Sequence, residues 1–236
     1  NSFLRYDDRS DTYRIHNIFS QYLLKHIHIY FNKKEQRSIF KRSGNWHVKN
    51  GDVLSALKAY LKAGEYDLIM KEFEKTGITK VLDRATTAIV EIFRQIPDEV
   101  KYRHPIGLLT YTEFHITNVD MQRGAELLAV ISQYYEQDTN ISSDMRRRIN
   151  GEVELIKSFL FFNDIKKMSI HHKEAHKLLN GSSSIANKEM IFTFGSPHTL
   201  YLYYREKGCM KRIVEHANEV FHYYNEVSHG CGTGFE

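Results

Sequence analysis

The chain has 236 residues, and 42% of them are hydrophobic, which is enough for a core and excludes a disordered chain. Its 13 glycines and 3 prolines are too few for a β-sandwich or barrel, which needs a turn about every 8–12 residues. The 33 basic and 29 acidic residues leave a net charge of only +4, which argues against a compact nucleic-acid-binding domain. The two cysteines indicate a reducing, cytoplasmic setting. No apolar run reaches about 18 residues, so we expect no membrane span.

The first 14 residues predict either a β-hairpin or a frayed end. Two short runs rich in aromatic residues, 3–6 and 12–14, flank an acidic loop, and this pattern is weakly typical of a hairpin. The chain begins at Asn1 without an initiator methionine, which indicates a fragment of a longer protein. A segment cut from its parent could equally form a frayed end.

From residue 13 onward, apolar residues recur every three or four positions, which is the pattern of amphipathic helices. The expected helices occupy residues 13–32, 35–50, 52–63, 65–76, 78–96, 99–118, 121–137, 143–163, 165–180, 186–207 and 209–228. The connections between them are short, so consecutive helices should pack antiparallel.

Residues 50–77 show the pattern of a tetratricopeptide-like helical hairpin. Asp52 is placed as an N-cap and Gly64 as the residue after a helix C-terminus, while Ala56 is small enough to let two helices approach closely. Weaker versions recur at residues 118–125 and 163–175. The sequence therefore predicts an all-α fold, in which antiparallel helical hairpins stack as a tetratricopeptide-like right-handed solenoid.

The sequence carries few signs of catalysis. It contains no glycine-rich phosphate loop, no paired-cysteine zinc motif and no nucleophile elbow, so we expect no enzyme and no cofactor in this chain. His171, His172 and His176 have a spacing that can hold a metal, but no carboxylate or cysteine at a matching position completes the set, so we expect a solvated helix face and no metal. The basic run 146–148 predicts either a phosphate contact or a solvated face.

Tyrosines gather with polar partners near the end of the chain. The candidate ligand- or partner-binding residues are Tyr201, Tyr204, Arg205, Tyr223, Tyr224 and His229. Tyrosine offers a flat ring with a polar tip, and arginine adds charge and hydrogen-bond donors, so together they suit a groove that binds a sugar or a peptide. The alternative is that these rings pack two long helices together.

Several stretches resemble large LuxR-type, MalT-like transcriptional regulators of the STAND class. Residues 12–24 resemble the family segment YRFHxLFxxFL, which closes its winged-helix part. Residues 46–67 are similar to a family stretch in which a tryptophan is followed by a turn at a glycine and then by a second turn at an Ala-Gly pair. Here these are Trp46, Gly51 and Ala63-Gly64. Residues 193–208 are similar to the block FGSPSxLYLYYREPG, from which His198 and Lys207 depart. Residues 223–232 resemble the YY…GHGxG that follows that block.

The resemblance implies a division into the end of a winged-helix-like element, residues 1–33, and a helical sensor region, residues 34–236. The parent protein would bind ATP and contact DNA through parts outside this chain. The helical region would bind a small-molecule inducer or a regulatory protein, self-associate and activate transcription in the cytoplasm. The alternative is a general tetratricopeptide-like interaction scaffold with no small ligand.

Overall fold

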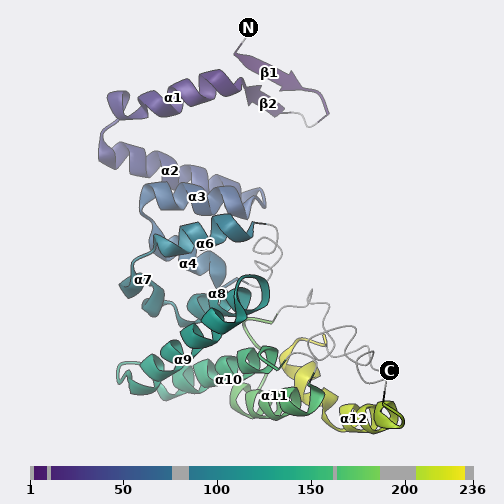
Figure 1. The fold of residues 1–236 in the computed structure, drawn as a ribbon. Coiled ribbons are helices and arrows are strands. Elements are labelled where there is room, and N and C mark those ends of the chain that lie inside the picture. Colours follow the sequence, from purple (N-terminus) through teal and green to yellow (C-terminus); the bar gives the residue numbers. More distant parts are fainter. Residues whose placement is uncertain (1–2, 10–11, 76–84, 162–163, 187–205, 232–236) are drawn as a thin grey trace. The chain divides into compact units, whose positions relative to one another are not determined.

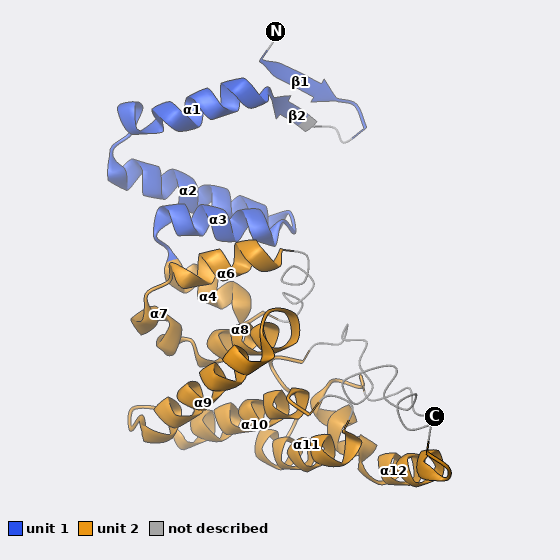
Figure 2. Ribbon diagram, viewed as in Figure 1, with its two compact units in different colours: residues 1–65 blue, residues 66–236 orange. Residues whose placement is uncertain are grey.

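The computed structural model describes residues 3–9, 12–75, 85–161, 164–186 and 206–231 (Figure 1). These residues are mostly helical, with a single two-stranded sheet among them, so the all-α prediction is confirmed at that level. The chain forms two compact units, residues 1–65 and residues 66–236 (Figure 2). The expected boundary near residue 33 lies between two helices of the first unit and stays a prediction. No helix in the described ranges is both long enough and apolar enough to cross a lipid bilayer.

The first unit opens with the predicted β-hairpin. Strands β1 (Leu4–Asp7) and β2 (Thr12–Ile15) pair antiparallel, with Leu4 opposite Ile15. The rings of Tyr6 and Tyr13, which are cross-strand partners, lie 5.1 Å apart. Because β2 continues to residue 15, helix α1 spans Asn17–Tyr30 rather than starting at residue 13.

Helices α2 (Lys33–Lys49) and α3 (Val53–Ala63) form the hairpin that the sequence predicts. The Asp52 side chain accepts a hydrogen bond from the Ser55 amide, and Gly64 ends α3 with a left-handed φ of 69°. The close approach depends on Gly44 as well as on Ala56. A Cβ on Gly44 would lie 2.4 Å from the Tyr60 ring, so only glycine fits here without displacing the ring.

The second unit contains eight helices within the described residues. They are α4 (Tyr66–Phe73), α6 (Thr86–Arg94), α7 (Asp98–Arg103), α8 (Pro105–Asn118), α9 (Met121–Gln137), α10 (Ser143–Phe159), α11 (Ile165–Leu179) and α12 (Cys209–Val227). The predicted helix 99–118 is wrong as a single element, because the chain breaks at His104 and α8 begins with Pro105 at its first turn. Proline is compatible with a helix start but disfavours helical backbone in the residue before it.

Side-chain caps fix the starts of α9, α10 and α11 where the sequence predicts them. Asp120, Ser142 and Asp164 each accept a hydrogen bond from the backbone amide three residues later, and such caps contribute about 1 kcal/mol each. Asn180 ends α11 with a left-handed φ of 48°. The expected helix 186–207 lies almost wholly outside the described residues.

The core of the second unit begins with aromatic packing and continues through close helix contacts. The rings of Phe93 and Tyr111 stack with centroids 3.4 Å apart, and the Phe73 ring meets both edge-on. Helices α8 and α9 approach closely at Gly124, where a Cβ would lie 2.9 Å from the Ile116 amide nitrogen. Helix α10 packs against α11, and α11 packs against α12.

Candidate ligand-binding site

Half of the predicted contact residues can be placed in the structure. Tyr201, Tyr204 and Arg205 lie outside the described residues, so their role stays a prediction. The other three, Tyr223, Tyr224 and His229, lie at the end of α12 and just after it, and they occupy three different environments.

Tyr224 is fully buried, so it packs inside the unit rather than on an exposed face. Its ring lies 4.5 Å from the ring of His172, which is also fully buried, on α11. Burial raises the pKa of Tyr224 and lowers the pKa of His172 to about 3, with a smaller contribution from His171 in the second case. Both side chains therefore stay neutral at physiological pH.

His229 holds the segment that follows α11. It has a left-handed φ of 56°, and its Nε2 lies 2.9 Å from the carbonyl oxygen of Ser183. The Ser183 amide donates to the carbonyl of Val227, and the Ser183 hydroxyl donates to the buried carboxylate of Glu152 at 2.5 Å. A second oxygen of Glu152 accepts from the Ser184 amide at 2.6 Å. These hydrogen bonds hold residues 183 and 184 against both α10 and α12.

Tyr223 lies beside a shallow cavity of about 580 Å³ that α10, α11 and α12 line. The side chains around it are already paired. His171 lies 2.7 Å from Glu154 and His176 lies 2.6 Å from Glu226, while the ammonium of Lys173 lies over the Tyr223 ring. Of the expected histidine pair, His172 and His176, the first is buried and only the second reaches this surface.

Across the part of the chain that the structure describes, no three His, Cys, Asp or Glu side chains come together in a way that could hold a metal ion. The basic run is also placed. The guanidinium of Arg146 donates to the carbonyls of Tyr135, Glu136 and Asp138 at the end of α9, and Arg148 donates to the Ser184 hydroxyl. These arginines therefore hold helix ends and a turn together.

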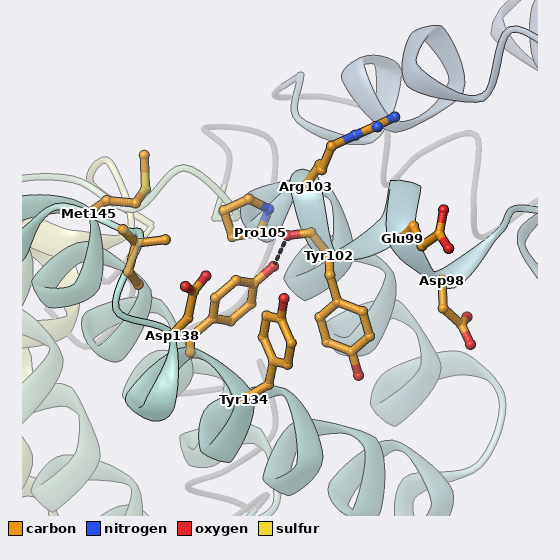
Figure 3. A pocket seen from close by; sticks show the side chains of 10 residues that line it. Asp98, Glu99, Tyr102, Arg103, Pro105, Tyr134, Asp138 and Met145 are labelled. Carbon is orange, nitrogen blue, oxygen red and sulfur yellow. Dashed lines mark hydrogen bonds between the residues drawn. The ribbon is translucent and has the colours of Figure 1, made fainter.

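A larger cavity of about 760 Å³ lies where α7, the start of α8 and the end of α9 meet (Figure 3). We call it the tyrosine cavity. Its lining residues are Asp98, Glu99, Tyr102, Arg103, Pro105, Tyr134, Tyr135, Asp138, Ile141 and Met145. The volume falls in the range of small-molecule sites, about 300–1,000 Å³.

Three tyrosines form the aromatic wall of this cavity. The rings of Tyr102 and Tyr134 lie side by side (Figure 3), with centroids 4.2 Å apart. The Tyr134 ring meets the Tyr135 ring edge-on at 5.1 Å. Tyr135 is 1% exposed, and its hydroxyl donates to the carbonyl oxygen of Tyr102 at 2.7 Å. Tyr134 is 43% exposed. Tyr135 therefore joins α9 to α7, while the exposed Tyr134 offers a ring that a ligand can reach.

The break between α7 and α8 positions the wall. His104 lies in that break, and its two ring nitrogens lie 2.9 Å from Glu74 and 3.1 Å from Asp67. Arg103 donates to both oxygens of the same Asp67 carboxylate, at 2.9 and 3.1 Å. The hydrogen bond from His104 and the charge of Arg103 lower the pKa of Asp67. These bonds fix the end of α7, and with it the backbone carbonyl of Tyr102.

Carboxylates flank the tyrosine pair on both sides. Figure 3 shows Asp138 on the side of Met145, and Asp98 and Glu99 on the opposite side, beyond Tyr102. Burial raises the pKa of Tyr102, and the nearby Asp98 carboxylate and the Tyr134 ring add to the shift. The Tyr102 hydroxyl thus keeps its proton and remains a hydrogen-bond donor.

Sequence patterns did not reveal this cavity, although seven of its ten lining residues lie within helix ranges that the sequence predicts. Tyr102 and Tyr134 are 32 positions apart, and only the break at Pro105 brings their helices to one place. The adjacent tyrosines 134 and 135 before Asp138 were a local signal. Two aromatic residues in succession cannot both face the core of a helix, because neighbours point about 100° apart.

No protein-family model matches the chain, and no curated protein and no solved structure matches it either.

Proposed function

We propose that this chain is the helical signal-sensing and partner-binding region of a LuxR-type transcription regulator, with the hairpins stacked as a tetratricopeptide-like solenoid. The observation that carries the proposal is the tyrosine cavity, an accessible aromatic hollow between helices, where binding sites in helical proteins commonly form. The resemblance of residues 12–24 and 193–208 to this family supplies the class of the parent protein. ATP binding and DNA contacts would belong to other parts of that parent, in the cytoplasm.

Ligand binding in this proposal acts through differential affinity. A ligand that contacts α7 and α9 together favours whichever arrangement of these helices it fits better, and so shifts a resting population towards the active, self-associated one. The contact between Tyr135 and the Tyr102 carbonyl is the bond that such a shift would change first, because it joins the two helices at the cavity wall.

A second function, a protein-interaction scaffold without a small ligand, is favoured by one observation in the first unit. Helix α1 has no buried residue. Its large exposed apolar side chains are Ile18, Tyr22, Leu23, Leu24, Ile29 and Tyr30. Exposed apolar surface of this extent is typical of an interaction surface.

A thermal-shift screen of sugars, amino compounds and nucleotides tests the sensing proposal and locates the site. A ligand that raises the melting temperature of the chain should lose its effect in Tyr134→Ala and keep it in Tyr223→Ala. The reverse pattern would place the site at the end of α12 instead. The scaffold function would be favoured if no small ligand bound the wild type or either variant, and the chain instead formed a stable dimer or captured a peptide.

The coding sequence that flanks this chain in its gene tests the class of the parent protein. We expect a phosphate-binding Walker motif upstream and a helix-turn-helix downstream. A reading frame that carries neither would contradict the regulator proposal, whatever the ligand screen finds.

A further inference from the structure

The charges around the tyrosine cavity are unbalanced. Its lining includes three carboxylates, from Asp98, Glu99 and Asp138, and one guanidinium, from Arg103. That guanidinium donates to Asp67, which lies outside the lining. The nearby guanidinium of Arg146 donates to three backbone carbonyls. The Asp98 carboxylate is paired with the ammonium of Lys101, so the excess negative charge of the cavity lies at Glu99 and Asp138.

Helix α7, which lines the cavity, shows how this fold accommodates a cation. The ammonium of Lys101 lies 2.8 Å from the Asp98 carboxylate and 5.0 Å from the centre of the Phe93 ring. Its side chain is only 14% exposed, so a carboxylate and an aromatic face together hold a largely desolvated cation. Ring faces attract cations because the ring quadrupole places negative charge above and below the ring.

The tyrosine cavity has the same combination of an aromatic face and carboxylates, around a larger space. The Tyr134 ring is accessible, and carboxylates flank the tyrosine pair on both sides (Figure 3). Ile141, Met145 and Pro105 supply an apolar part of the lining. The volume of about 760 Å³ is much larger than an inorganic cation needs, so the occupant carries carbon as well as charge.

We propose that the tyrosine cavity binds an organic cation, an ammonium or guanidinium group on an aliphatic stem. The charged group lies against the Tyr134 ring, within reach of Glu99 and Asp138, and the stem packs along Ile141 and Met145. This inference rests on the proposed function, because it names the ligand class of the same site. The cation is either a small free amine or the side chain of a partner protein.

Matched probes test the charge requirement directly. Choline is compared with its neutral tert-butyl analogue, dimethylbutanol, which has nearly the same shape but no charge, and binding to the full chain is followed by the shifts of tyrosine ring signals in NMR. We expect choline to bind about tenfold more tightly, which is the size of one favourable cation–ring contact with carboxylate support. Its binding should weaken as the salt concentration rises from about 0.02 to about 0.15 M.

Substitutions identify the groups that act. Tyr134→Leu should weaken choline binding about tenfold, whereas Tyr134→Phe, which keeps the ring face, should leave it within about twofold. Glu99→Gln should weaken it about threefold or more, and Glu126→Gln, on α9 outside the lining, serves as the matched control. Tyr134 and Glu99 are both exposed, so these variants should fold, and far-UV circular dichroism checks this.

A capped arginine peptide separates the two sources of the cation. Tighter binding of the peptide than of choline assigns the cavity to a partner side chain, and the opposite order assigns it to a free amine. Equal affinities for choline and the neutral analogue, no binding of any cationic probe, or binding that Tyr134→Leu leaves unchanged would each overturn the proposal. A neutral ligand from the thermal screen that needs Tyr134 would overturn the cation proposal and leave the sensing function intact.

Discussion

The buried imidazole of His172 should make the stability of the second unit depend on pH in a specific way. His172 is fully buried on α11, and burial lowers its pKa to about 3 in the folded protein. In the unfolded chain a histidine has a pKa of about 6.5. As the pH falls below that value, only the unfolded chain takes up the proton, so acidification favours unfolding.

The magnitude follows from the two pKa values. Between about pH 7.5 and about pH 5.5 the unfolded imidazole becomes protonated while the folded one stays neutral, which removes about 1.4 kcal/mol of the free energy of unfolding. The buried carboxylate of Glu152 acts in the opposite sense. Burial raises its pKa, so its contribution is greatest at low pH and declines as the pH rises through the folded value. The prediction is therefore made for the difference in the free energy of unfolding between wild type and a His172 variant, in which the contribution of Glu152 cancels.

The assay is urea denaturation of wild type and His172→Leu at about pH 7.5, 6.5 and 5.5, followed by far-UV circular dichroism and by hydrogen exchange of α10 and α11. Wild type should lose about 1.4 kcal/mol more than the variant across this range. His28→Leu, at an exposed position in the last turn of α1, should follow the wild-type curve. Parallel curves for wild type and His172→Leu would refute the reasoning that burial keeps this imidazole neutral.

Two further substitutions test the packing. Gly124→Ala should destabilise the second unit by about 2 kcal/mol, because the new Cβ would lie 2.9 Å from the Ile116 amide nitrogen and overpacking against backbone outweighs the gain in helix propensity of about 1 kcal/mol; thermal melts check this, and an unchanged midpoint would contradict it. Glu152→Ala should cost about 2 kcal/mol and speed amide exchange at Ser184, since the Ser183 hydroxyl and the Ser184 amide lose their acceptor; slow exchange there would show that the cluster does not hold the segment.

Local sequence signals accounted for most helix boundaries. Asp52, Gly64, Asp120 and Ser142 begin or end helices where their chemistry predicts, because capping depends on residues within one turn of each other. One exception was residues 99–118, where apolar spacing continued through a proline. The restriction that proline places on the preceding residue was the stronger signal, and it breaks the chain at His104.

The candidate site was beyond local reasoning. Periodicity identifies a buried face but not which faces meet, so Tyr224 was counted among contact residues although its ring is enclosed with His172. Periodicity also could not predict the contact between Tyr102 and Tyr134, because that contact depends on the turn between α7 and α8.

The sequence by itself determined that this chain folds as amphipathic helices with defined caps, since periodicity and capping act over a few residues. The tertiary structure alone decided which side chains are enclosed and which carboxylates flank an accessible ring. The physical reason is that burial and the electrostatic field of a site are sums over residues distant in the chain, and only packing sets those distances.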